Sequence, residues 1–172
     1  MARTLVIYYS RKGENYVNGS IRSLRKGNTE IVAEFIQKAV GADLFEVETV
    51  REYDRDYTVC TEEAKAELRQ DARPALKRTL DSVTAYDNIV VAGPCWWGTY
   101  PMAILTQLDA LDFTGKKVLP VMTHEGSGLS GSAQALKKHC KGASVGAGMA
   151  IHGADAAQSE QAVADWAKKN LI

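Results

Sequence analysis

Residues 89–105 read Ile-Val-Val-Ala-Gly-Pro-Cys-Trp-Trp-Gly-Thr-Tyr-Pro-Met-Ala-Ile-Leu, which is a strand, a loop and the start of a helix in succession. The apolar run 89–92 predicts a strand buried on both faces, and Pro101 opens a predicted helix over 102–111. The loop between them carries two adjacent tryptophans, and at least one ring must lie near the surface, where it needs a cover. Either a flat aromatic cofactor covers it, or both rings close the edge of the core.

Strand-like and helix-like segments alternate outward from this unit. The predicted strands cover residues 5–9, 43–50, 88–92, 117–122 and 144–151. The predicted helices cover residues 29–39, 62–69, 74–83, 102–111, 132–140 and 159–169. This alternation implies a five-stranded parallel sheet with helices on both faces, which is a three-layer α/β sandwich. We expect one domain over residues 1–172, with Pro120 as the feature that weakens its strand, because proline lacks a ladder donor.

Composition excludes several classes of protein. Lysine plus arginine and aspartate plus glutamate number 21 each, so the basic excess typical of nucleic-acid binding is absent. No apolar run reaches about 18 residues, and no export signal is recognisable, so we expect neither a membrane span nor secretion. The three cysteines Cys60, Cys95 and Cys140 lie far apart and form neither a redox pair nor a zinc motif. We therefore expect a cytoplasmic protein with reduced thiols and no bound metal.

The loop after the first strand is rich in groups that bind phosphate. Residues 10–15, Ser-Arg-Lys-Gly-Glu-Asn, offer a hydroxyl, an amide, two cations and a flexible glycine. The next helix starts only at Gly27-Asn28-Thr29, where Asn28 or Thr29 can cap free N–H groups that favour an anion. The segment 12–26 separates the two halves of this expected phosphate loop, and we favour residues 27–29 for the main contact with the phosphate. The alternative is an ordinary polar loop before a capped helix.

The loop after the fourth strand reads Thr123-His124-Glu125-Gly126-Ser127-Gly128. Two glycines around a serine allow a sharp turn that exposes backbone N–H groups to the edge of a heterocycle. The alternative is a turn that only redirects the chain, and we expect no acid–base role for His124. In a parallel sheet, all three loops meet at the carboxyl edge of the strands. Together they supply phosphate donors, an aromatic plate and a polar clamp, which are the groups that flavin mononucleotide (FMN) needs.

The chain resembles the flavodoxin family over nearly its whole length. Tyr8-Tyr9-Ser10-Arg11 followed by Gly27-Asn28-Thr29 is similar to the family's phosphate loop, S-R-x-G-N-T. The stretch 94–101, Pro-x-Trp-Trp-Gly-x-x-Pro, resembles its ring-packing loop, and residues 123–128 resemble the loop at the polar edge of the ring. The resemblance implies a sheet ordered 2-1-3-4-5 and non-covalently bound FMN.

The resemblance also implies roles for individual residues. Ser10, Asn28 and Thr29 would hold the phosphate, with Arg11 or Asn15 as helpers. Trp97 is the better candidate than Trp96 for the ring plate. The full set of expected cofactor-binding residues is Ser10, Arg11, Asn15, Gly27, Asn28, Thr29, Pro94, Cys95, Trp96, Trp97, Gly98, Thr123, His124, Glu125, Gly126, Ser127 and Gly128.

Two main functions follow from this resemblance. The first is an electron-transfer flavoprotein that exchanges electrons with redox partner proteins. The second is an NAD(P)H-dependent reductase of a small quinone-like substrate. Family carriers are generally acidic and this chain is neutral, and no tyrosine after the fourth strand covers the second ring face, so both features leave the reductase open. A structural or sensor domain with an empty or differently filled pocket is the third interpretation.

Overall fold

A parallel sheet forms the centre of the computed structural model, which describes residues 2–172. Its strands run in the order β4-β1-β5-β6-β7, and β8 also pairs with β6 beyond the end of β7. With β7 and β8 counted as one interrupted strand, this confirms the predicted order 2-1-3-4-5. The strands are β1 (Thr4–Tyr8), β4 (Asp43–Glu46), β5 (Asn88–Pro94), β6 (Lys117–His124), β7 (Ser144–Val145) and β8 (Met149–His152).

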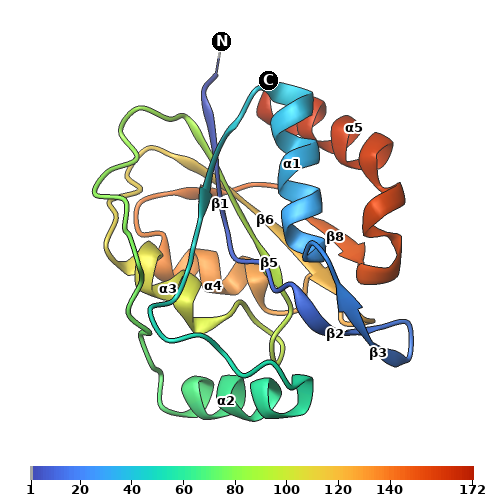
Figure 1. The fold of residues 1–172 in the computed structure, drawn as a ribbon. Helices are drawn as coiled ribbons and strands as arrows, with labels where there is room; N and C mark the ends of the chain where they lie inside the picture. Colours follow the sequence, from blue (N-terminus) through green and yellow to red (C-terminus); the bar gives the residue numbers. More distant parts are fainter. Residues whose placement is uncertain (1) are drawn as a thin grey trace.

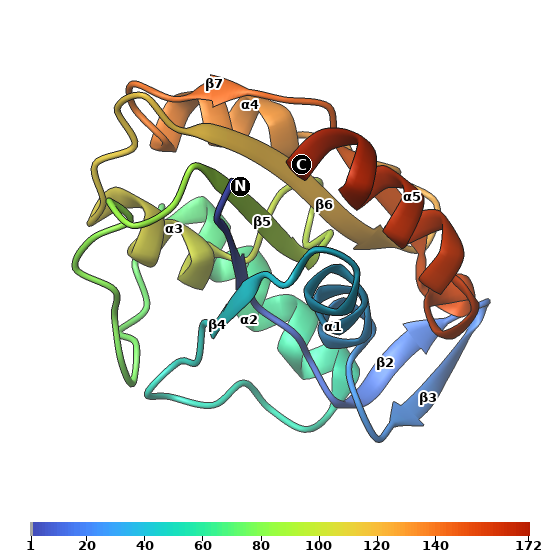
Figure 2. The same cartoon turned by 90° about the horizontal axis from the view of Figure 1, so that it is seen from above.

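Helices cover both faces of the sheet, as Figures 1 and 2 show. They are α1 (Asn28–Val40), α2 (Tyr57–Arg69), α3 (Met102–Asp109), α4 (Ser132–His139), the 3-10 helix η1 (Gly153–Gln158) and α5 (Glu160–Leu171). Strand β1 alternates between the two faces. Leu5 and Ile7 join the core under α3 and α4, whereas Val6 and Tyr8 join the core under α1 and α5. No helix within residues 2–172 is long and apolar enough to cross a membrane.

Proline at position 120 explains why the last strand is interrupted. Val118 accepts a hydrogen bond from the Gly146 N–H at 2.8 Å, so the same edge of β6 faces β7 and β8 at Val118 and at Pro120. Pro120 has no N–H to donate there. A Cβ on Gly148 would lie 2.7 Å from Pro120 Cγ, so the chain passes this point with a glycine. The single strand predicted over 144–151 is therefore wrong, and two short strands replace it.

The segment 12–26, which interrupts the expected phosphate loop, is mostly an antiparallel hairpin. Strands β2 (Gly13–Val17) and β3 (Ser20–Leu24) form a separate sheet. Asn18 and Gly19 make the turn with φ of 51° and 89°, the left-handed values that a tight hairpin turn requires. The hairpin leaves the end of β1 and returns to the start of α1 (Figure 1).

Two helix predictions differ from the structure between β4 and β5. Helix α2 begins at Tyr57, not at 62, because the Asp56 side chain accepts the Val59 N–H at 3.0 Å and caps it. The helix predicted over 74–83 is wrong. Its residues run along the edge beyond β4, where the Lys77 N–H donates to the Glu48 carbonyl at 2.9 Å.

Candidate functional site

The two halves of the expected phosphate loop lie against each other. The Glu30 N–H donates to Ser10 Oγ at 3.0 Å, so a side chain from the end of β1 caps α1. The helix itself begins after Gly27, which offers no side chain for this purpose. A Cβ on Gly27 would lie 2.7 Å from the Arg11 carbonyl oxygen, which explains the glycine. Helix capping here is therefore done by Ser10 rather than by Asn28 or Thr29.

The two tryptophans of the ring-packing loop have different environments. The Trp96 ring packs edge-to-face on Tyr9 and Tyr53, with ring centroids 5.1 and 5.0 Å away, and adjoins the core under α3 and α4. The Trp97 side of the loop is open, and that residue is 49 % exposed. The two interpretations of the adjacent tryptophans thus apply to one ring each. Trp96 closes the edge of the core, and Trp97 is available to a ligand.

Trp97 is held in place at some cost. Its φ of 55° and the φ of 84° at Gly98 form a tight turn, closed by the Trp96 N–H to Thr99 carbonyl bond of 2.8 Å. The left-handed region costs a residue with a side chain about 1–2 kcal/mol. The indole Nε1 donates to the Thr61 carbonyl of α2 at 2.9 Å, and Lys65 Nζ lies 5.1 Å from the ring centroid. Strain that persists with such fixation is typical of a functional position.

A cavity of about 270 Å³ lies between this loop and α2. The lining residues are Arg11, Asn15, Tyr57, Cys60, Thr61, Ala64, Cys95, Trp96 and Trp97. The four residues from α2 recur at helical spacing, so one stripe of that helix forms a wall. Burial raises the pKa of the Cys60 thiol to about 11, so this wall carries no thiolate at neutral pH. The cavity is thus mostly aromatic and apolar, with polar groups at the Arg11 end, as is typical of small-molecule sites.

The loop after β6 is tied to both of the other loops. The Thr123 carbonyl accepts the Cys95 N–H at 2.9 Å, and its hydroxyl lies 2.8 Å from the buried Thr29 hydroxyl of α1. Gly126 and Gly128 have φ of 138° and 62°, and a Cβ on either would meet nothing within 4 Å. Thr29 and Thr123 therefore join the loops, while the two glycines leave backbone open to a ligand.

Glu125 links this loop to the hairpin turn. Its Oε1 accepts the Asn18 N–H at 2.6 Å, and its Oε2 lies 3.7 Å from His152 Nε2. His124 Nδ1 accepts the Gly126 N–H at 2.9 Å, which requires the neutral ring. Burial, with a contribution from His152, lowers the pKa of His124, in keeping with that bond. The side chains of Glu125 and His124 thus shape the loop and its contact with the hairpin.

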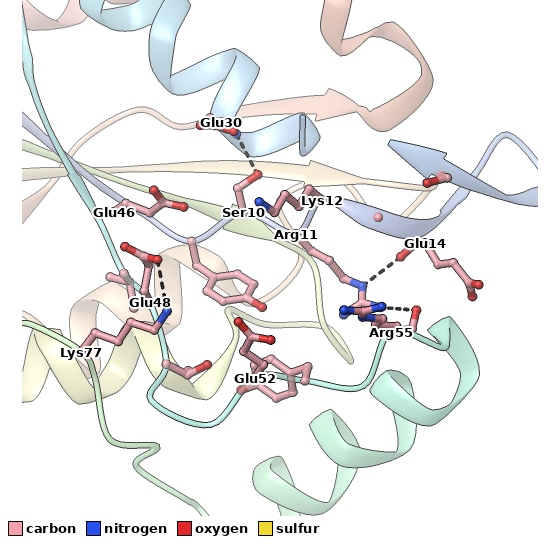
Figure 3. A pocket seen from close by; sticks show the side chains of 16 residues that line it. Ser10, Arg11, Lys12, Glu14, Glu30, Glu46, Glu48, Glu52, Arg55 and Lys77 are labelled. Atoms are coloured by element: carbon pink, nitrogen blue, oxygen red, sulfur yellow. Dashed lines mark hydrogen bonds and ion pairs between the residues drawn. The ribbon is translucent and has the colours of Figure 1, made fainter. Parts of the chain in front are cut away.

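A second and larger cleft, of about 830 Å³, opens on the other side of Arg11 (Figure 3). Its walls carry Glu30, Glu46 and Glu48, with Lys77 Nζ 3.8 Å from the Glu48 carboxylate. Burial and then repulsion from Glu48 and Glu30 raise the pKa of Glu46. The same lining includes Ser10, which caps α1, and the cations Lys12, Arg55 and Lys77, so the cleft carries charges of both signs.

Arg11 lies between the two cavities and ties three segments together. Its Nε donates to the Glu14 carbonyl at 2.9 Å, and its Nη2 donates to the carbonyls of Asp54 and Arg55 at 2.9 and 3.1 Å. Figure 3 shows the guanidinium extended toward Glu14 and Arg55, away from Glu30 at the start of α1. Asn15 Nδ2 in turn donates to the Arg11 carbonyl at 2.8 Å. In this structure Arg11 and Asn15, the expected helpers in phosphate binding, hold the loop after β1 together.

The structure thus brings most of the expected site residues to one edge of the sheet, in three groups. Ser10 and Gly27 meet at α1, with Asn28 close by. Arg11, Asn15, Cys95, Trp96 and Trp97 line the cavity, and Pro94 and Gly98 lie on the same loop. Residues 123–128 adjoin the cavity loop through Thr123 but lie outside the cavity lining.

Sequence reasoning missed the contribution of α2. Tyr57, Cys60, Thr61 and Ala64 recur at intervals of three and four residues, which is the pattern of one helical face. Asp56 before them is a typical capping residue, so the helix start was detectable. The Tyr57 ring also stacks on Tyr16 of the hairpin, with centroids 6.2 Å apart and an interplanar angle of 25°. An aromatic residue at the cavity therefore comes from α2 rather than from the loop after β6.

Comparison with known proteins places this fold. The flavodoxin family model matches residues 22–170. A protein provisionally assigned as a flavoprotein from Bacteroides uniformis is 27 % identical, with a TM-score of 0.75 over 97 % of this chain and 98 % of that one. A second, from Bacteroides eggerthii, is 25 % identical, with a TM-score of 0.78 over 100 % and 99 %.

More distant structures share the fold. A flavoprotein from Lactobacillus acidophilus, crystallised in complex with FMN, is 20 % identical, with a TM-score of 0.65 over 92 % of this chain and 98 % of that one. No curated protein matches the sequence. Because the family model spans most of the chain, and the strand order and loops agree with it, the chain belongs to the flavodoxin family.

Proposed function

We propose that this protein binds FMN without a covalent bond and carries electrons between partner proteins. The flavin ring would enter the cavity between Trp97 and α2, and the phosphate would lie at the start of α1. One observation carries this proposal: the exposed indole and the helix start belong to segments that Thr29, Thr123 and Cys95 hold together. The FMN complex of the Lactobacillus acidophilus protein, which has the same fold, supports it.

The residues at the start of α1 fit a phosphate. The first N–H groups of a helix have no partner within the helix, and its dipole favours an anion there. Ser10 Oγ accepts the Glu30 N–H, which leaves the Ser10 O–H free to donate to a phosphate oxygen. The Asn28 side chain, at the first helical position, is half-buried, with its amide nitrogen beside Gly153. These neutral donors can hold the phosphate without a paired cation.

The residues around the cavity fit the ring. Trp97 offers an aromatic face, and its bond to Thr61 fixes that face relative to α2. Tyr57, Cys60 and Ala64 of α2 line the same cavity and would exclude water from one side of the ring. The open backbone at Gly126 and Gly128 suits the polar edge of the ring. When bound, FMN supplies the redox chemistry, and the protein sets its position and surroundings.

The wall formed by α2 favours a carrier over a reductase. Hydride transfer from a nicotinamide requires one flavin face to be open to a stacked substrate. Here both Trp97 and a stripe of α2 line the cavity, so a ring bound there would have its faces covered and its edge as the route to solvent. Electron exchange through an exposed edge needs only a docked partner, so we assign protein partners rather than a small quinone-like substrate.

The experiment is an anaerobic titration of the purified protein. We expect an absorption band near about 450 nm from bound flavin, or its appearance when FMN is added to apoprotein. Riboflavin is the control ligand, and it should bind more weakly because it lacks the phosphate. NADPH alone should leave the band unchanged, while dithionite should bleach it. Failure to take up FMN would refute the binding proposal, and rapid bleaching by NADPH would refute the carrier role.

A further inference from the structure

We propose that the β2–β3 hairpin is a docking surface for an electron-transfer protein with an acidic face. This inference rests on the proposed carrier function, because it names the kind of partner that the function requires. The hairpin lies at the same edge of the molecule as the cavity. Asn15 of β2 lines the cavity, and Tyr16 stacks on Tyr57 of its α2 wall. A partner seated on the hairpin therefore lies beside the flavin site.

The hairpin exposes apolar side chains that no core requires. Tyr16 and Ile21 face each other across the two strands and are 43 % and 51 % exposed. Through Tyr57, this pair continues along α2 to Trp97, which is 49 % exposed. Exposed aromatic and aliphatic side chains beside a cavity are characteristic of interaction sites.

The outer strand of the hairpin has a free edge. Strand β3 pairs with β2, and among residues 2–172 it has no second neighbour. Its backbone groups on that side can therefore pair with another chain. Four of its five residues are exposed (Figure 1 shows the strand projecting from the body of the molecule).

The charges on the hairpin select the partner. Segment 12–26 contains four cations and one carboxylate, in a chain whose net charge is zero. The carboxylate, Glu14, accepts the Tyr57 N–H at 2.9 Å and faces α2. Arg22 and Arg25 are exposed and, within the described residues 2–172, form no ion pair. Lys65 adds a third cation beside Trp97. The net charge of segment 12–26 is therefore positive and complements an acidic partner.

The same charges disfavour a second copy of this chain. Antiparallel pairing of two β3 strands about their centre would place Arg22 opposite Arg22 of the other copy. Like charges opposite each other destabilise strand pairing. Arg25 and Lys26 of both chains would lie within a few residues of the same contact. An acidic partner relieves this repulsion, whereas a second copy doubles it.

The test is an NMR titration of the ¹⁵N-labelled, FMN-treated full chain. Oxidised plant-type ferredoxin is the acidic probe and cytochrome c the basic one. Ferredoxin should shift the amides of residues 16–25 and the Trp97 indole N–H, with an affinity that falls roughly fivefold or more between about 25 and 200 mM NaCl. Cytochrome c should bind roughly tenfold more weakly. Arg22→Glu/Arg25→Glu should weaken ferredoxin binding roughly tenfold or more.

The matched control is Lys168→Glu/Lys169→Glu, a double reversal of exposed charges at the end of α5, and it should change the affinity less than about twofold. The docking surface is overturned by shifts confined to other regions, by equal losses in both double variants, by no ferredoxin binding at low salt, or by self-association that the arginine variant abolishes. Ferredoxin binding without FMN uptake would instead retain the surface and refute the proposed function.

Discussion

Two cavities open at the same edge of the sheet, on either side of Arg11, and their linings differ in chemistry. The smaller one is walled by Trp97, Trp96 and a stripe of α2. The larger one is walled by carboxylates at the ends of α1 and β4 (Figure 3). Both share the end of β1, so the strand edge alone does not determine the site. The elements that follow each strand decide which cavity accepts an anionic aromatic ligand.

The two cavities also differ in the charge and protonation of the side chains that line them. In the larger cleft, burial and like charges raise the pKa of Glu46, and the lining carries charges of both signs. In the aromatic cavity, Cys60 is a neutral thiol and the exposed Trp97 ring is part of the lining. Size therefore does not identify the cavity for the ring, because the larger one lacks the exposed Trp97 ring.

The largest expected effect comes from removing the aromatic plate. Trp97→Ala should weaken FMN binding roughly tenfold to a hundredfold, because stacking on an aromatic side chain is worth about 1–3 kcal/mol. The measurement is a fluorescence titration of apoprotein with FMN. Glu48→Gln, in the larger cleft, is the control and should change Kd less than about twofold. Equal affinities for Trp97→Ala and the parent protein would remove the distinction between the cavities.

Ser10→Ala should affect both folding and binding. The loss of the bond to the Glu30 N–H should lower the free energy of unfolding by about 1 kcal/mol. The lost hydroxyl should weaken FMN binding several-fold and leave riboflavin binding nearly unchanged, since only FMN has the phosphate. Urea unfolding and ligand titration test both points. Ser23→Ala, on the cleft side of β3, serves as the control, and similar losses there would contradict the assignment.

Two glycines with left-handed φ allow an effect on FMN binding to be distinguished from an effect on the stability of the fold. Gly98→Ala and Gly41→Ala each place a Cβ at positive φ, 84° and 69°, and each should destabilise the fold by about 1 kcal/mol. Only Gly98 belongs to the Trp97 turn, where the new Cβ would also lie 3.4 Å from Ser130 Oγ. We therefore expect reduced FMN affinity for Gly98→Ala alone. Reduced affinity in both variants would indicate an effect of stability.

The smallest expected effect is the pH dependence of stability that Glu46 causes in the larger cleft. The pKa of Glu46 is raised in the folded state. Its favourable contribution to the free energy of unfolding is therefore present below the ordinary glutamate pKa, and it is lost as the pH rises through the raised pKa. Glu46→Gln should therefore raise the thermal unfolding midpoint at pH 7 by about a degree, with no gain below about pH 4. Thermal scans across this range test it, with exposed Glu62→Gln on α2 as the control. A lower midpoint at pH 7 would contradict the sign.

The sequence predicts the central sheet well because its strands are continuous apolar runs. Residues 5–8 and 89–92 are buried on both faces, and such runs have few alternative structures. The interruption of the last strand is harder to predict, since it depends on the meeting of Pro120 with Gly148 in three dimensions. Proline signalled a weakness in its own strand, but the neighbouring strand is the one that breaks.

The regions around the site were less predictable. Asn18-Gly19 is a strong hairpin signal, yet the flanking residues are mostly polar and no core face marks them as strands. Pro74 suits a helix start, but the chain there pairs with the edge after β4, and Gln107 fixes both backbone groups of Leu80 at 2.7 and 3.0 Å. Such long-range contacts leave no local pattern. The three loops could be found because each follows a recognisable strand.

The most direct test of the central claim is a crystal structure of the protein with FMN. We predict the isoalloxazine ring against Trp97 in the cavity that α2 lines, and the phosphate beside Ser10 and the first turn of α1. A ring bound in the larger cleft, away from Trp97, or a phosphate bound away from Ser10 would contradict this prediction.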